Sequence, residues 1–204
     1  MNGDTHGARA HGDAHGARAH GDAHGAPMRD GGAMHAKDIL IDGYNRIQEE
    51  VHATVEGLGP DELAARPSPD TNSIAWLIWH LTRVQDDHIA DAFGLDQVWL
   101  TQDWEKRFGL GLPRHDTGYG HSPAKVAKVR VDSGDLLTGY YDAVHAQSLD
   151  ALRGLAAKDL ERIVDERWDP PVSLGVRLVS VLSDDLQHVG QAAYLKGLLQ
   201  STAA

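Results

Sequence analysis

The 204-residue chain contains no cysteine. Disulfide bonds, thiolate metal sites and cysteine nucleophiles are therefore excluded, and any bound metal has to be held by His, Asp, Glu or water. Basic residues are also scarce, because 19 Lys and Arg stand against 30 Asp and Glu and leave a formal net charge of −11. Proteins that bind nucleic acids normally carry a clustered basic face, so we expect no nucleic-acid partner.

Long apolar runs and a secretion signal are also missing. No stretch of about 18 or more apolar residues occurs, so no segment is predicted to cross a membrane. The N-terminus lacks the basic and then apolar layout of a signal peptide. The apolar content of 41% is enough for the core of one ordinary domain. We therefore expect a soluble cytoplasmic protein.

The N-terminal segment is of low complexity. Residues 6–26 contain the nine-residue unit HGARAHGDA twice and the start of a third copy. Gly and Ala without apolar periodicity cannot bury enough surface to offset the entropy of ordering, so we predict a disordered tail over residues 1–33. The domain is predicted to follow over residues 34–204. A metal site without fixed geometry has little selectivity, so we interpret the histidines of the tail as part of the repeat and not as a functional metal site.

After the tail, apolar residues recur every three or four positions in four segments. This spacing predicts four helices, at roughly 35–57, 73–93, 123–152 and 174–199. Ser122 and Pro123 resemble the N-cap and first turn of the third helix, with residues 126–131 in its first turns. Residues 95–123 lack a sustained period, which is typical of a long functional connection. Without a convincing strand signal, the pattern predicts an all-α four-helix bundle, a frame that readily hosts metals between facing helices.

The fourth predicted helix carries the candidate metal ligands Asp184 and His188. These residues are four positions apart, so they project from one face and can share one ion. Their neighbours are apolar, and an unpaired charge beside them would be costly. Asp185 is an alternative carboxylate ligand, because it lies nearer the middle of the apolar stripe. The spacing leaves both carboxylates open.

The second predicted helix supplies a third candidate ligand, His80, within the apolar segment IAWLIWHL. A lone His in such a segment is more often a satisfied core residue than a ligand. Asp87, seven residues further on, shares the face of His80 and could orient it through a hydrogen bond. His88 also lies close to the apolar face and is an alternative ligand.

Two segments resemble the signature segments of the DinB/YfiT superfamily. They are NSIAWLIWHL followed by RVQDD in the second predicted helix, and DDLQHVGQAAYLKGLL in the fourth. Residues 35–199 fit the layout of that family, whose members are four-helix bundles that bind a divalent metal. Their ligands are one His on the second helix and a pair four residues apart late in the chain. The pair is His and His in many members, and Glu and His in relatives such as mycothiol-dependent maleylpyruvate isomerase.

The resemblance implies a metal site formed by His80, Asp184 and His188, with Asp184 standing where those relatives have Glu. Zinc is the first choice for the metal, and nickel, iron and manganese suit the same donors. Trp76 lies one turn before His80 and Gln191 three residues after His188, so both are candidates to line the pocket or to hydrogen-bond a ligand.

The resemblance also implies a function and an assembly. It suggests a metal-dependent thiol S-transferase or isomerase that uses mycothiol or a similar low-molecular-weight thiol on an electrophilic small molecule, and a homodimer. Three protein ligands leave coordination positions open, so such a site can activate a thiol or a water molecule. The alternatives are therefore a hydrolase that uses metal-bound water and a metal-binding stress protein without turnover.

Overall fold

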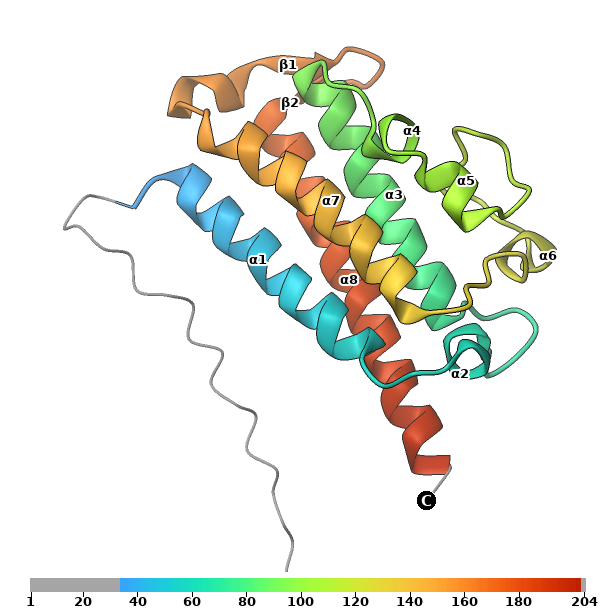
Figure 1. The fold of residues 1–204 in the computed structure, drawn as a ribbon. Helices are drawn as coiled ribbons and strands as arrows, with labels where there is room; N and C mark the ends of the chain where they lie inside the picture. The colour runs from blue at the N-terminus through green and yellow to red at the C-terminus, as the bar shows by residue number, and fades with distance from the viewer. Residues whose placement is uncertain (1–33, 203–204) are drawn as a thin grey trace, which may run out of the picture. The chain divides into compact units, whose positions relative to one another are not determined.

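Four long helices form the framework of the computed structural model, which describes residues 34–202. They are α1 (Ala36–Val55), α3 (Ile74–Phe93), α7 (Gly134–Arg153) and α8 (Leu174–Thr202). The helices lie side by side as a bundle (Figure 1), which confirms the predicted all-α four-helix architecture. The predicted disordered tail, residues 1–33, lies outside the described residues. None of the described helices is long and apolar enough to cross a membrane.

The packing of the bundle sets α3 beside α8. Both α7 and α8 pack against α1 and α3, so α7 and α8 occupy opposite corners. The chain directions follow from side-chain contacts: Arg177 near the start of α8 contacts His88 near the end of α3, so these two helices are antiparallel. Lys196 near the end of α8 donates to the carbonyl oxygens of Ala53 and Glu56, so α1 and α8 are parallel.

Short elements connect the long helices. They are α2 (Pro60–Ala64), α4 (Val98–Thr101), α5 (Trp104–Phe108), α6 (Pro123–Val126), a 3₁₀ helix (Ala157–Glu161), β1 (Ile163–Asp165) and β2 (Val172–Ser173). The two strands form a small antiparallel hairpin in which Ile163 pairs with Ser173 and Asp165 with Val172. These strands were not predicted, because they are only three and two residues long and too short to show an alternating pattern.

The ends of α3 follow from local chemistry. The Oγ atom of Ser73 accepts a hydrogen bond from the backbone N–H of Trp76, which satisfies one of the free donors of the first turn. Gly94 ends the helix in the left-handed conformation, with φ of 67°. Most side chains between these residues are buried. The helix therefore carries His80 into a low-dielectric part of the bundle.

The third long helix begins later than predicted. A separate short helix, α6, ends at Val126, and α7 begins only at Gly134. Ser133 is the N-cap of α7, and its Oγ accepts from the backbone N–H of Asp135. The prediction that residues 126–131 form the first turns is therefore wrong. Val129 and Val131 are nevertheless buried, so their apolar character reflects a connection that packs on the core.

The connection after α3 is fixed to the bundle by a buried carboxylate. Asp86 on α3 accepts hydrogen bonds from the backbone N–H groups of Val98 and Trp99, at 2.9 and 2.8 Å. It also accepts one from the hydroxyl of Tyr140 on α7, at 2.8 Å. The ring of Trp99 packs on Tyr140, with centroids 5.1 Å apart. These contacts hold the start of the segment that later passes over His80.

Candidate metal centre

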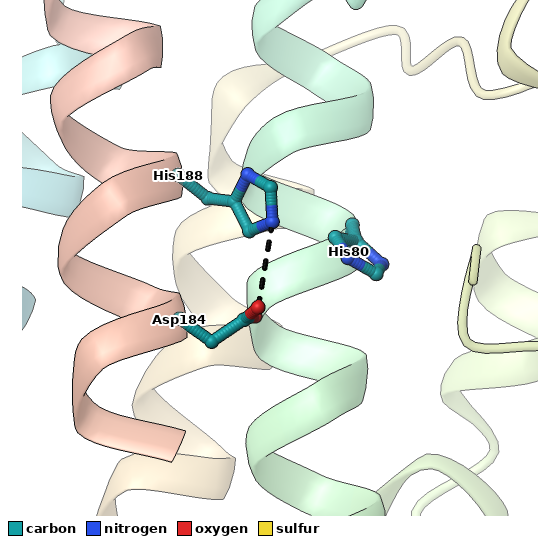
Figure 2. Close-up of side chains that lie close together, drawn as sticks. All are labelled: His80, Asp184 and His188. Carbon is teal, nitrogen blue, oxygen red and sulfur yellow. Dashed lines mark ion pairs between the residues drawn. The ribbon is translucent and has the colours of Figure 1, made fainter. Parts of the chain in front are cut away.

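Side chains from α3 and α8 converge at one place between the two helices. His80 comes from α3, and Asp184 and His188 come from successive turns of α8 (Figure 2). One possible ligand atom from each residue lies within 4.8 Å of the other two. The Nε2 atom of His188 is 3.6 Å from Oδ1 of Asp184, and the imidazole centroids of His80 and His188 are 4.8 Å apart. The antiparallel packing of α3 on α8 thus assembles a compact N, N, O donor set.

The hydrogen bonding of His80 leaves one ring nitrogen free. Its Nδ1 lies 2.5 Å from the carbonyl oxygen of Thr117, which can only accept, so Nδ1 carries the proton. Nε2 then presents a lone pair, the form of imidazole that metals bind. The side chain is buried, and burial lowers the pKa of His80 below its ordinary value, although the bond to Thr117 opposes this shift. The neutral ligand form is therefore favoured near pH 7.

Close approach of the backbone to His80 depends on Gly118. Its φ of +93° lies in the region that residues with side chains rarely adopt. A Cβ atom at this position would lie 2.7 Å from Nδ1 of His80 and 3.0 Å from the ring of Trp79. Glycine therefore permits the contact between the Thr117 carbonyl and His80.

Further contacts hold the segment that contains Thr117 and Gly118 against α3. The indole of Trp76 stacks on His80, with centroids 4.5 Å apart, and its Nε1 donates to Nδ1 of His121 at 3.1 Å. Nε2 of His121 donates in turn to Oδ1 of Asp116 at 2.9 Å. The His121 side chain is only 1% exposed. Trp76, predicted from its spacing, thus contacts His80 directly, whereas Asp116, Thr117 and His121 lie in an aperiodic segment and were missed.

The ligand candidates on α8 also present free acceptor atoms. Nδ1 of His188 donates to Oε1 of Gln191 at 3.2 Å, which leaves Nε2 on the side of Asp184. Oδ2 of Asp184 is buried and has no hydrogen-bond partner within the described residues. An unpaired buried carboxylate oxygen is costly unless a cation compensates it. Two imidazole Nε2 atoms and this oxygen match the donors that divalent metals such as zinc prefer.

Comparison with known proteins supports the same interpretation. The family model described as the DinB superfamily matches residues 44–192. The chain belongs to the DinB superfamily. A crystal structure described as the conserved protein of locus from Enterococcus faecalis is similar, with 32% identity and a TM-score of 0.78 over 83% of this chain and 99% of that chain. No curated protein matches at a significant level.

All three candidate ligands lie within the part of the chain that matches the DinB superfamily. Between the two rival carboxylates, the structure places Asp184 and not Asp185 in the group. Asp185 is fully buried on the core side of α8, where neither oxygen has a hydrogen-bond partner among the described residues. Burial, with a contribution from the charge of Asp184, raises the pKa of Asp185 well above its usual range. Burial therefore disfavours the ionised form of Asp185, which is the form that a metal binds.

The other residues predicted around this DinB-superfamily site lie further along α3. Nδ1 of His88 lies 3.3 Å from Nη1 of Arg177, so the alternative ligand His88 is outside the group. Asp87 accepts from Nε2 of Gln97 at 2.7 Å. In place of the predicted Asp87, the carbonyl oxygen of Thr117 orients His80, because seven residues of helix place Asp87 about 10 Å away along the axis.

Proposed function

We propose that His80, Asp184 and His188 bind one divalent metal ion, zinc being the first choice, and that the protein uses it as a metal-dependent enzyme. The observation that carries the proposal is the convergence of His80, Asp184 and His188, which offer ligand atoms within 4.8 Å of one another, at a carboxylate that has one buried oxygen without a hydrogen-bond partner among the described residues. Three protein ligands leave coordination positions open, as in catalytic rather than structural zinc sites. Bound there, the ion supplies Lewis acidity that makes a thiolate or hydroxide available near neutral pH.

A hollow of about 590 Å³ beside the site offers space for a small molecule. Its lining includes Thr117, whose carbonyl orients His80, and Val84, one turn beyond His80 on α3. Tyr119 and Trp168 also line the hollow and present largely exposed rings. The rest of the lining is polar, formed by Asp87, His88, Asp165, Arg167 and Arg177, so the hollow suits a small organic molecule that carries both apolar and polar groups.

The likeness to thiol-dependent relatives supports a low-molecular-weight thiol, mycothiol or a similar compound, as the co-substrate. The proposed reaction is S-transfer to, or isomerisation of, an electrophilic small molecule. Such thiols are kept reduced in the cytoplasm, which agrees with a cytoplasmic location for this chain. Trp76 and the Asp116–His121 pair then hold His80 in position, while Gln191 does the same for His188.

Metal content tests the ligand set. We expect the His188→Ala variant of the full chain to lose about one equivalent of zinc per chain relative to the wild type, because one of three ligands is removed. The matched control is His88→Ala, which removes the rival histidine and should leave the metal content unchanged. The tail histidines are present in every variant, so they cancel in the comparison. Full metal content in folded His188→Ala protein would overturn the proposal.

A second assay separates the thiol from water. The zinc-loaded protein is given 1-chloro-2,4-dinitrobenzene as an electrophile, with and without mycothiol, and chloride release and thioether formation are followed. The thiol sulfur forms a bond to the ring carbon, chloride leaves, and the thiol proton goes to the buffer. Turnover that requires mycothiol and is lost in Asp184→Asn supports the proposal. Thiol-independent turnover would instead indicate a hydrolase, and binding of metal without any turnover a non-catalytic protein.

A further inference from the structure

Charged side chains gather at one end of the hollow beside the candidate metal centre. The β1–β2 hairpin lies where α3 ends and α8 begins (Figure 1), and it contributes Asp165 and Arg167 to the lining. Arg177 comes from α8 and His88 from α3. None of these four residues belongs to the group of candidate metal ligands. They are here called the guanidinium cluster.

Asp165 fixes two guanidinium groups side by side. It accepts hydrogen bonds from Nε and Nη2 of Arg167, both at 2.9 Å. Nη2 of Arg177 donates to Oδ2 of the same carboxylate at 2.8 Å. The Asp165 side chain is only 2% exposed, whereas that of Arg167 is 81% exposed. A ligand in the hollow therefore meets the guanidinium groups rather than the carboxylate that orients them.

Several N–H donors of this cluster remain free for a ligand. Nη1 of Arg167 makes no hydrogen bond within residues 34–202. Nη1 of Arg177 lies 3.3 Å from Nδ1 of His88, and because Arg can only donate, Nδ1 is the acceptor. Nε2 of His88 then carries the ring proton and is another donor without a partner in the described part of the chain. Asp87, the other acidic residue of the hollow, already accepts from Nε2 of Gln97.

We propose that Arg177 and Arg167 bind a carboxylate group of a small molecule whose other end reaches the metal. This proposal deepens the proposed function and rests on it for the metal end. Asp165 balances only one of the two cations, although the chain as a whole has a net charge of −11. The planar fork of Arg matches the two oxygens of a carboxylate, and such charge-assisted hydrogen bonds are stronger than neutral ones.

The spacing of residues along α8 sets the length of this ligand. Arg177 is seven residues before Asp184 and eleven before His188, so two and three helical turns bring the three side chains to one face. Thr117, whose carbonyl contacts His80, lines the same hollow as Arg177. The hollow therefore extends from the candidate metal centre to the guanidinium cluster. Seven helical residues place the two ends of the ligand about 10 Å apart.

The remaining lining of the hollow suits an apolar body between these ends. Val84 lies one turn beyond His80 on α3, and the exposed rings of Tyr119 and Trp168 border the hollow. Aromatic side chains beside a few fixed polar groups are typical of sites that hold an organic ligand. The carboxylate can belong to the electrophile or to the thiol, because both have to lie beside the metal.

Binding of a simple carboxylate tests the guanidinium cluster apart from the metal. Saturation-transfer NMR on the full chain, with and without zinc, compares 3-phenylpropionate with 3-phenylpropan-1-ol, in which a hydroxyl replaces the carboxylate. We expect a clear signal from the carboxylate alone in both states and its loss in Arg177→Met. The matched control Arg46→Met removes an Arg from an exposed ion pair on α1, outside the hollow, and should keep the signal. Equal signals from both compounds in the wild type would overturn the proposal.

A second variant keeps this test decisive if the loss of Arg177 unfolds the chain. Arg167 is largely exposed, so Arg167→Met should fold normally, as circular dichroism checks. We expect it to weaken the 3-phenylpropionate signal because one of the two guanidinium groups is missing. A signal as strong as that of Arg46→Met in a folded Arg167→Met or Arg177→Met protein would assign that Arg no part in binding, and such a result for both would overturn the proposal.

Cobalt(II) in place of zinc tests the distance between the two ends. Absorption from thiolate-to-cobalt charge transfer reports a sulfur atom on the metal. We expect 6-mercaptohexanoate to bind about tenfold more tightly than 6-mercaptohexan-1-ol, and the difference to disappear in Arg167→Met but not in Arg46→Met. Equal affinities in the wild type would contradict a ligand that spans both ends. Absence of the absorption with either thiol would contradict the thiol function, and the NMR comparison would still decide whether the carboxylate binds.

Turnover then assigns the carboxylate to the electrophile or to the thiol. With mycothiol as the thiol, 4-chloro-3,5-dinitrobenzoate is compared with 1-chloro-2,4-dinitrobenzene; in both, sulfur bonds to the ring carbon and chloride leaves. A preference in kcat/KM for the benzoate that Arg167→Met removes supports the proposal with the electrophile as the source. A ratio that Arg167→Met leaves unchanged, together with tighter binding of 6-mercaptohexanoate, supports it with the thiol as the source.

Discussion

At the scale of single residues, the candidate metal centre depends on Gly118. Its substitution by Ala places a Cβ against Nδ1 of His80 and strains a positive φ. The loop then has to move, and the Thr117 carbonyl no longer fixes the ring. We expect Gly118→Ala to weaken zinc binding about 10- to 100-fold, the usual effect of losing an orienting partner of a ligand. Calorimetric zinc titration of the full chain measures it.

The control for this prediction is Gly120→Ala. Gly120 also has a positive φ, of +67°, but nothing lies within 4 Å of a Cβ built there. This variant therefore carries comparable backbone strain without the contact to His80. An equal loss of zinc affinity in both variants would show that the close approach of Gly118 to His80 is unimportant.

The sequence indicated the side chains of the candidate site better than their surroundings. His80, Asp184 and His188 lie on helices, where a spacing of three or four residues predicts a shared face. The orienting group of His80 is a backbone carbonyl, that of Thr117, which has no sequence signature. His121 reaches Trp76 only because the aperiodic segment after α5 folds back across α3. Contacts of this kind depend on the path of the chain and not on local spacing.

At the scale of secondary-structure elements, long helices were predictable and short ones were not. The helix predicted at 73–93 agrees with α3, Ile74–Phe93. Its apolar residues recur regularly, and the sequence marks both ends, with Ser73 as the N-cap and Gly94 after the last turn. The start of α7 was misplaced because the valines after α6 pack on the core without being helical. α4 and α5, of four and five residues, are too short for a periodic pattern and are held by contacts with Asp86 and Tyr140.

The N-cap of α3 gives a prediction at this scale. Ser73 is 2% exposed and its Oγ accepts from the N–H of Trp76, so Ser73→Ala leaves a buried donor without a partner. We expect a loss of about 1 kcal/mol in the free energy of unfolding by urea. Ser122, the N-cap of α6, makes no such side-chain bond. Ser122→Ala should therefore change stability by much less, and equal losses would refute the role of the Ser73 cap.

At the scale of the whole molecule, buried ionisable groups predict how stability depends on pH. Burial lowers the pKa of His80, His88 and His145 in the folded chain. As pH falls below about 6.5, the ordinary pKa of His, the unfolded chain binds protons that the folded chain binds less readily. Stability should therefore decrease on the acid side, by up to about 1.4 kcal/mol per pH unit for each of His80 and His145 and by less for His88, whose side chain is 37% exposed to solvent.

Asp185 acts in the opposite direction. Burial raises its pKa well above the ordinary value of 3.8, so above that pH the folded chain holds a proton that the unfolded chain has lost. Stability then decreases as pH rises, until the folded carboxyl itself ionises. Above pH 7 the histidine contributions have ended, so Asp185 alone sets the slope among these groups. The histidine contributions and the Asp185 contribution therefore slope in opposite directions with pH.

Two variants separate the limbs of this profile. Asp185→Asn, which cannot ionise, should flatten the decrease above pH 7 and leave the acid limb in place. His145→Gln should weaken the acid limb alone, because His145 lies away from the candidate metal centre and donates to Asn45 at 3.1 Å. Urea unfolding from pH 5 to 9 with a chelator present measures both without a contribution from metal binding. A profile of Asp185→Asn that still falls above pH 7 would show that this carboxyl is already ionised in the folded bundle.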